Sequence, residues 1–367
     1  MSESESARDG ASTPWLRIVR FALAGTLLMS LGVFLDLEAK GGHVVGLIQP
    51  GADGPSIDVF EDDFPELDIP DGLGHDGQQF YAVARAPMHL DQVSEDLDRP
   101  RYRLQRPVFP ALSWALHPSG GGEGLVIAMA IVGVAAIFLA GVGAGLLSTT
   151  LGGGTWPALL IPLLPGTYAA LRLSLADTLA IGFVLLSLAS SERRSVGPAT
   201  IAAVLAAFTK ESLLVVLVAH ALFRRTRASI TAAVTSVASS AAWWVALRLL
   251  VQADEEQVIE FPHPVGGIVP NLGDWTSGTD VVAALSVVGA FVLAAVALWR
   301  RGPSHPLIGA LAAATAFSVF LGPSVLGPDF NGPRTMGPVL ILAILTLGTP
   351  STRDEASDDV FPASATA

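Results

Sequence analysis

Residues 74–87, "GHDGQQFYAVARAP", gather side chains that can do chemistry around one tight turn. The spacing of the apolar residues after the turn predicts a short helix over 78–85. Asp76 would lie at its N-terminus, where the helix dipole favours an anion by ~0.3–1 kcal/mol. An ionised carboxylate there suits a general base. The alternative is a plain helix cap, a position that Asp often occupies. His75, Gln78 and Tyr81 are candidate substrate-binding residues beside Asp76.

Four arginines follow in the stretch 97–116: Arg99, Arg101, Arg103 and Arg106. The planar guanidinium binds phosphate oxygens through paired hydrogen bonds. This set of four is therefore a candidate to hold a lipid phosphate at the membrane face. The alternative for any single arginine is simple contact with lipid headgroups.

Lys210 and Glu211 stand in the middle of the apolar run 198–223. A charge inside a membrane costs ~2.5–3.5 kcal/mol on insertion scales and is usually functional. The alternatives are a structural ion pair and the tip of a re-entrant segment that reaches interfacial water. The remaining charged candidates lie in short loops: Arg172 and Asp177, and then Asp329, Asn331 and Arg334.

Composition places these residues in a membrane protein. Of the 367 residues, 51% are hydrophobic and only 15% are charged, whereas globular chains carry roughly 25% charge. The chain has no cysteine, which excludes disulfides and thiolate chemistry. It also has no basic face for nucleic acid. No P-loop, dinucleotide fingerprint or serine nucleophile elbow is present.

Apolar runs predict an all-α polytopic membrane protein with about eight spans and one re-entrant helix pair at 198–223. The first run is too long for a signal peptide, so we expect a retained span. The expected spans are 15–36, 123–147, 155–172, 175–191, 229–251, 281–299, 305–321 and 335–349.

Arginine clusters set the expected orientation in the plasma membrane. All the clusters fall on the cytoplasmic side if 198–223 enters and leaves on that side. Both termini are then cytoplasmic, and the disordered tails 1–14 and 350–367 flank a membrane domain over 15–349. Three loops face outward: 37–122, 252–280 and 322–334. Loop 37–122 is large enough for a subdomain, and its acidic part, 58–72, is expected to be irregular.

This topology brings Asp76, the arginine set, Asp177 and Arg334 to the same side of the membrane. Their convergence predicts a polar site at the outer surface, roofed by loop 37–122.

The motif residues resemble a bacterial membrane-protein family. "GHDGQQFYAVARAP" and "LDRPRYRLQRPVFPALSWAL" are similar to its G-[YH]-D-G-Q-x-F-Y and L-D-x-P-x-Y-R-x-Q-R motifs. Segments 163–186 and 205–216 are similar to two further motifs of that family. Gln79 departs from it, standing where an aromatic residue is usual. The family looks like a distant branch of the GT-C glycosyltransferases.

The resemblance implies a glycosyltransferase that takes a sugar from a polyprenyl-phosphate donor to a cell-envelope acceptor. It places Asp76 in the catalytic position. It implies that Arg101, Arg103, Arg106, Lys210 and Arg334 bind the lipid phosphate, with Asp177 and Glu211 in the same site. Mg²⁺ or Mn²⁺ could bind weakly at Asp76 and the acidic residues 58–71, although no metal-ligand spacing stands out.

Two other functions remain open at this stage. A non-catalytic scaffold or polymer-assembly subunit would keep the fold without the chemistry, as the Gln79 departure allows. A transporter would show internal repeats and polar residues along a path through the spans. Neither feature is evident in the sequence.

Overall fold

The computed structural model describes residues 14–252, 263–269, 271, 278–327 and 330–350. Within these ranges every regular element is a helix, which confirms the all-α prediction. The two predicted tails fall almost entirely outside the described residues. So do Asp329 and most of the predicted outer loop 252–280.

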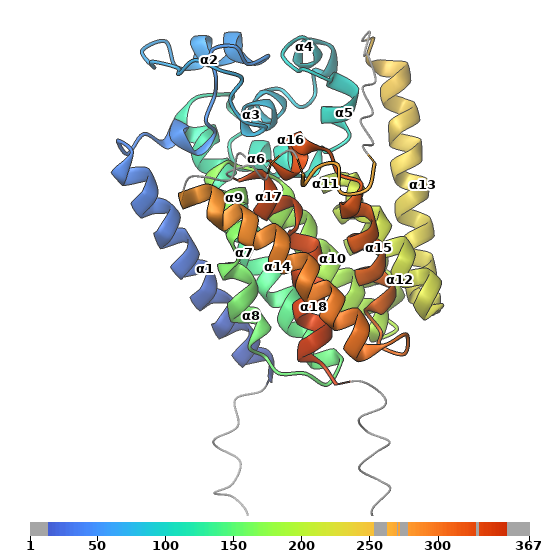
Figure 1. Ribbon diagram of the computed structural model, residues 1–367. Helices are drawn as coiled ribbons and strands as arrows, with labels where there is room; N and C mark the ends of the chain where they lie inside the picture. Colours follow the sequence, from blue (N-terminus) through green and yellow to red (C-terminus); the bar gives the residue numbers. More distant parts are fainter. Residues whose placement is uncertain (1–13, 253–262, 270, 272–277, 328–329, 351–367) are drawn as a thin grey trace, which may run out of the picture.

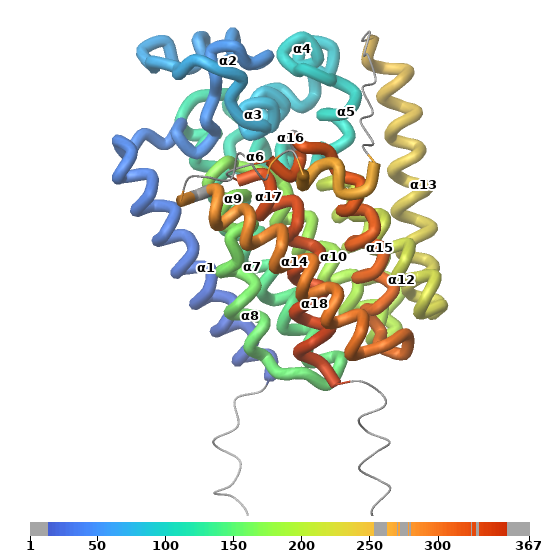
Figure 2. Tube along the Cα trace, viewed as in Figure 1, coloured from blue at the N-terminus to red at the C-terminus, as the bar shows by residue number. Residues whose placement is uncertain are grey.

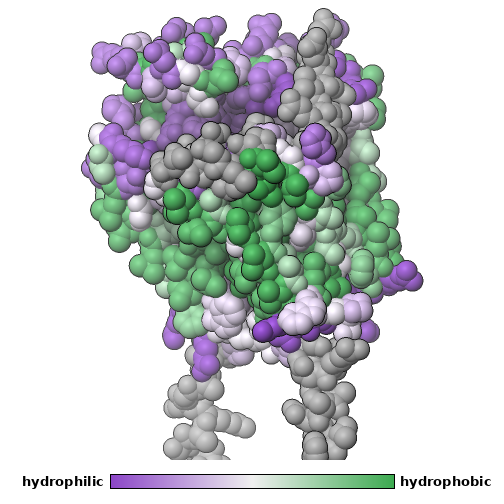
Figure 3. Space-filling model, in the orientation of Figure 1, coloured by the Kyte–Doolittle hydropathy of each residue, from purple (hydrophilic) through white to green (hydrophobic). Residues whose placement is uncertain are grey.

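The helices form two layers (Figure 1). A layer of long, apolar helices fills the lower part, and short helices with polar surfaces cover it from above. On the face that Figure 3 shows, an apolar belt lies over the lower layer between a broad polar cap and a narrow polar rim. Such a belt fits a helical protein embedded in a membrane. Figure 2 shows that the first described helix, α1, begins on the same face as the last, α18, ends.

Among the described residues, four helices are long and apolar enough to cross a membrane. They are α1 (Pro14–Ala39), α7 (Glu123–Thr150), α13 (Arg227–Leu250) and α14 (Gly278–Arg301). Shorter apolar helices in the described residues are α11 (Val196–Thr209), α15 (Ile308–Val319) and α18 (Gly337–Gly348). The lower layer also holds α10 (Asp177–Glu192). About eight spans were expected, and four of the described helices are long enough to cross a membrane by themselves.

The span expected over 155–172 is not one helix. It is divided into α8 (Pro157–Leu160), a 3₁₀ turn (Ile161–Leu163) and α9 (Pro165–Arg172). Proline lacks the amide hydrogen that an inner helical turn needs, and three prolines stand in this segment. The segment packs closely on α1, where a Cβ on Gly25 would lie 2.7 Å from the carbonyl oxygen of Leu159.

The run 198–223 folds as a hairpin of two short helices, α11 (Val196–Thr209) and α12 (Leu214–Arg224), joined by a 3₁₀ turn (Glu211–Leu213). Lys210 at the turn pairs with Asp177 at the start of α10. Arg224 at the end of α12 pairs with Glu192 at the end of α10. The hairpin therefore begins and ends beside the C-terminal end of α10, and its turn lies beside the N-terminal end of α10. At 14 residues, α11 is about 21 Å long, short of a ~30 Å hydrocarbon core.

The polar cap, which we call the roof, consists of the short elements between α1 and α7. They are a 3₁₀ turn (Val44–Leu47), α2 (Ile57–Asp63), α3 (Gly77–Arg85), α4 (Leu90–Glu95), α5 (Pro100–Leu104) and α6 (Val108–Leu116). The helix expected over 78–85 is confirmed as α3. The expectation that 58–72 is irregular is wrong for α2. Val59 and Phe60 are buried in the roof's core, and this burial stabilises two helical turns in an acidic segment.

Two further short helices complete the fold near the roof. They are α16 (Pro323–Leu326) and α17 (Asn331–Thr335), and α17 leads directly into α18. A Cβ on Gly166 of α9 would lie 2.4 Å from the carbonyl oxygen of Pro333. This close approach fixes α17 against α9 and so fixes the position of Arg334.

Candidate functional site

A cavity of about 550 Å³ lies between the roof and the helices below it. Its walls come from α3 and α5 of the roof and from α10, the α11–α12 turn, α15, α17 and α18. These segments are far apart in the sequence. Eight of the eleven predicted site residues line it: His75, Asp76, Arg103, Arg106, Asp177, Lys210, Glu211 and Arg334. Of the residues predicted to converge, Asp76, Arg103, Arg106, Asp177 and Arg334 meet at this cavity, and Arg101 does not line it.

Asp76 is held at the upper wall by two arginines from different parts of the fold. Arg103 Nη1 donates to Asp76 Oδ1 at 2.9 Å, and Arg334 Nη2 donates to Oδ2 at 3.0 Å. Asp76 precedes α3 but makes no side-chain capping hydrogen bond. The interpretation of Asp76 as a plain helix cap is therefore wrong, because its carboxylate binds arginines instead.

These arginines determine the charge of Asp76. Burial disfavours the ionised carboxylate, but the positive charges of Arg103 and Arg334 outweigh burial and hold the pKa of Asp76 below its usual range. The carboxylate is therefore ionised at neutral pH. It is also a weak base for as long as both arginines remain in place.

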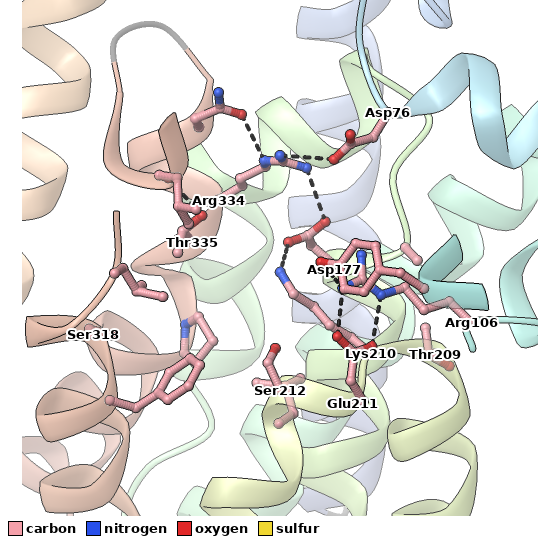
Figure 4. Close-up of a pocket in the computed structure, with 18 of the residues that line it drawn as sticks. Asp76, Arg106, Asp177, Thr209, Lys210, Glu211, Ser212, Ser318, Arg334 and Thr335 are labelled. Atoms are coloured by element: carbon pink, nitrogen blue, oxygen red, sulfur yellow. Dashed lines mark hydrogen bonds and ion pairs between the residues drawn. The ribbon is translucent and has the colours of Figure 1, made fainter. Parts of the chain in front are cut away.

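Arg334 joins Asp76 to a second acidic residue (Figure 4). Its Nη1 lies 3.8 Å from Asp177 Oδ2, and Asn331 accepts a hydrogen bond from its Nε at 3.1 Å. Asp177 is only 7% exposed and also pairs with the ammonium group of Lys210. Arg103, Asp76, Arg334, Asp177 and Lys210 thus form one continuous chain of alternating charges.

A separate ion pair closes the side of the cavity near α11. Arg106 Nε and Nη2 donate to the two carboxylate oxygens of Glu211 at 2.8 and 2.6 Å. The Tyr102 ring lies under the Arg106 guanidinium, with its centroid 4.3 Å away. This two-point fork fixes Arg106 more firmly than a single contact would. The pair also links the roof to the turn of the hairpin.

Asp98 is a site residue that the sequence interpretation missed. It binds the Nε and Nη2 of Arg103 at 2.8 and 2.9 Å and leaves Nη1 to reach Asp76. The backbone amide of Asp98 donates to the Gln79 side chain at 3.3 Å. Gln79, which departs from the motif of the resembled family, thus fixes the loop that orients Arg103. No helical spacing joins these residues, because Pro100 begins a new helix between Asp98 and Arg103.

The opposite end of the cavity is mostly apolar. The apolar lining comes from the 3₁₀ turn Glu211–Leu213, from α12, α15 and α18 and from the segment that precedes α16: Leu213, Val215, Val216, Ala314, Phe317, Leu321, Pro338 and Val339. The hydroxyl groups of Ser212 and Ser318 also line the cavity (Figure 4). The polar end carries five basic and three acidic side chains among the described lining residues. Asp98, which binds Arg103 from behind, reduces the excess to one positive charge. The cavity therefore matches an amphiphile with an anionic head and an apolar chain.

Comparison with protein families, curated proteins and solved structures gave no match. The resemblance stated above thus remains an expectation from the motifs.

Three predicted substrate-binding residues lie away from the cavity. Gln78 donates to the carbonyl oxygen of Leu73 at 2.6 Å. Tyr81 donates to Asp63 Oδ2 at 2.6 Å and accepts from the amide of Gly122. Arg101 donates to the carbonyl oxygen of Val251 at 3.1 and 3.0 Å. All three side chains hold the roof together, and none lines the cavity in this structure.

Arg172 does not join Asp177, its neighbour in the sequence. Its Nε donates to Asp36 Oδ2 of α1 at 2.6 Å, so it ties α9 to α1. Among the described residues, no group of three or more histidine or acidic side chains is arranged to hold a metal ion. We therefore assign no metal ligands in this cavity.

Proposed function

We propose that this protein is a membrane glycosyltransferase that moves a sugar from a polyprenyl-phosphate donor to a cell-envelope acceptor. The observation that carries the proposal is the two-ended cavity, in which basic side chains stand opposite an apolar wall. A polyprenyl-phosphate sugar has the same two parts, a charged phosphate and a hydrocarbon chain.

The phosphate would bind where the guanidinium and ammonium groups converge. Arg103 and Arg334 both bind the Asp76 carboxylate at this point. Lys210 is close by, because it pairs with Asp177. Arg106 stands at the neighbouring wall. Guanidinium groups bind phosphate oxygens through short, charge-assisted hydrogen bonds. The isoprenoid chain would lie along the apolar wall formed by α12, α15 and α18.

The proposed reaction breaks the bond between the anomeric carbon and the phosphate oxygen, and the electron pair stays on the phosphate. An acceptor hydroxyl oxygen forms the new bond to the anomeric carbon, and Asp76 takes the hydroxyl proton. The basic residues stabilise the charge that develops on the leaving phosphate. Because the leaving group departs as an anion, no general acid is needed.

We place the cavity at the outer face of the plasma membrane. Arginines gather at the end of the helix layer away from the roof: Arg193, Arg224 and Arg301 stand where α10, α12 and α14 end. Basic residues favour the cytoplasmic side, so the roof would face outward. Both termini would then be cytoplasmic.

The test is sugar transfer in membranes from a panel of polyprenyl-phosphate sugars. Wild type is compared with Asp76→Asn at matched expression. We expect transfer from at least one donor, and a loss of about 10²–10⁴-fold in the variant because the base is absent. Transfer that the substitution does not change would remove Asp76 from the reaction.

One observation favours a second candidate, a non-catalytic protein that holds a lipid phosphate within an assembly. Both oxygens of the Asp76 carboxylate are already bound by arginines, which suits a structural role. This candidate predicts tight binding of polyprenyl phosphates without transfer. It also predicts that Asp76→Asn leaves cellular function intact.

A further inference from the structure

We propose that Arg103 and Arg334 mask Asp76 and that the donor's phosphate unmasks it by taking over both arginines. This inference rests on the proposed function, because it concerns the order of events at the same site. It makes donor binding the step that creates the base, so the donor binds before the acceptor is activated.

The masking is a matter of geometry. Oδ1 of Asp76 accepts from Arg103 and Oδ2 accepts from Arg334, at 2.9 and 3.0 Å. Each oxygen that would accept a proton from the acceptor therefore already accepts a charged hydrogen bond, which lowers its basicity. The same N–H groups are the best donors for a phosphate at the polar end of the cavity. The Asp76 carboxylate thus stands in the place of two phosphate oxygens.

Arg334 can exchange the Asp76 carboxylate for a phosphate. Its Nη2 binds Asp76 at 3.0 Å, and its Nη1 is only 3.8 Å from Asp177, so neither Nη group is held by Asp177 through a short hydrogen bond. Its Nε is held by Asn331, so the guanidinium can stay where it is while its Nη groups accept a new anion. Arg103 is likewise held from behind by Asp98 through Nε and Nη2. Both arginines can therefore exchange carboxylate for phosphate without leaving their positions.

The backbone beside Asp76 is fixed, whereas its side chain is held only by the two arginines. A Cβ on Gly77 would lie 2.3 Å from the carbonyl oxygen of Leu173, so the chain packs tightly against the end of α9. The Asp76 side chain borders the cavity and is 27% exposed. Displacement therefore means rotation of the side chain into the cavity. A carboxylate freed from two cations binds a proton more strongly, as a general base must.

The test uses farnesyl phosphate, a soluble isoprenoid monophosphate, and measures its affinity for the purified full-length protein in detergent by calorimetry. Farnesol and inorganic phosphate are measured in parallel to separate the contribution of the chain from that of the phosphate. We expect Asp76→Asn to bind farnesyl phosphate about tenfold tighter than wild type, because the ligand no longer competes with a carboxylate.

Asp76→Glu keeps the competing charge and should bind as wild type does. Asp91→Asn makes the same change on the exposed surface of α4 and should also bind as wild type does.

A double variant separates displacement from simple repulsion between Asp76 and the ligand. If the phosphate takes Arg103 from Asp76, the tightening caused by Asp76→Asn shrinks at least threefold in an Arg103→Gln background. Repulsion alone would leave the tightening unchanged, and that result would overturn the inference. If Asp76→Asn does not fold, Asp177→Asn replaces it, because Asp177 also competes for Arg334.

The outcomes also separate this inference from the proposed function. Wild type that binds farnesyl phosphate while Asp76→Asn binds it no tighter would overturn the masking and leave the donor class standing. Wild type that binds neither farnesyl phosphate nor inorganic phosphate would overturn both proposals.

Discussion

Arg101 and Arg103 stand two positions apart on α5 and serve different parts of the protein. Arg103 points into the cavity and binds Asp76, whereas Arg101 binds the backbone carbonyl of Val251 at the end of α13. They form a matched pair for testing the phosphate site. We expect Arg103→Gln to weaken farnesyl phosphate binding by about 10–100-fold, since a charged hydrogen bond contributes roughly 1.5–3 kcal/mol.

Arg101→Gln serves as the control in the same calorimetric titration. It removes the same charge from the same helix, so its affinity should stay within about threefold of wild type. Equal losses in the two variants would mean that α5 attracts the lipid only through its general positive charge.

The sequence predicted individual charged residues of the site better than the contacts between them. Asp76 is predicted from its place before a short helix and Lys210 from the cost of a charge inside an apolar run. The arginines of 97–106 are predicted from the affinity of guanidinium groups for phosphate. Asp98 was missed, since its contact with Arg103 depends on the turn before Pro100. Gln78, Tyr81 and Arg101 stand in motifs beside site residues, yet their side chains point elsewhere. A motif can predict that a segment matters without predicting which way each side chain points.

At the scale of elements, the roof depends on Tyr81 of α3. Its hydroxyl links Asp63 of α2 to the Gly122 amide before α7, and Asp63 also binds Arg85. We expect Tyr81→Phe to lower the free energy of unfolding by ~1–3 kcal/mol, because buried hydrogen bonds are lost. Thermal unfolding in detergent measures this change. The affinity for farnesyl phosphate should stay near wild type. Lower affinity at unchanged stability would restore Tyr81 as a substrate-binding residue.

In the helix layer, charged residues within apolar runs predicted the position of a turn, whereas hydropathy alone mispredicted a span. Lys210 and Glu211 in an apolar run predicted a turn, and the structure has one there because both side chains find partners of opposite charge. The segment 155–172 was misjudged from hydropathy alone. Its prolines break it into short helices that pack on α1, which hydropathy does not report.

At the scale of the whole molecule, orientation can be tested with single cysteines, because the chain has none of its own. Ser94 lies on α4 of the roof, and Ser195 precedes α11 at the opposite end of the layer. We expect a membrane-impermeant maleimide added to intact cells to label Ser94→Cys and to leave Ser195→Cys unlabelled. Labelling of Ser195→Cys from outside would reverse the proposed orientation.

The apolar half of the cavity is the feature that separates a lipid-phosphate site from a site for a free anion. It is built by α12, α15 and α18, which meet only in the folded protein. A second apolar groove lies on the outer surface of α12 and α13, where Ile230 and Val234 are exposed. That groove offers hydrocarbon contact without the cluster of basic residues.

The most direct test of the account is photolabelling with a polyprenyl phosphate that carries a diazirine on its first isoprene unit. If the cavity binds a lipid phosphate, we expect labelled peptides from α12, α15 or α18, around Val215, Phe317 and Val339. We also expect that farnesyl phosphate abolishes this labelling and that farnesol does not. Labelling confined to the groove on α12 and α13, or unaffected by farnesyl phosphate, would contradict the claim that this cavity binds a lipid phosphate.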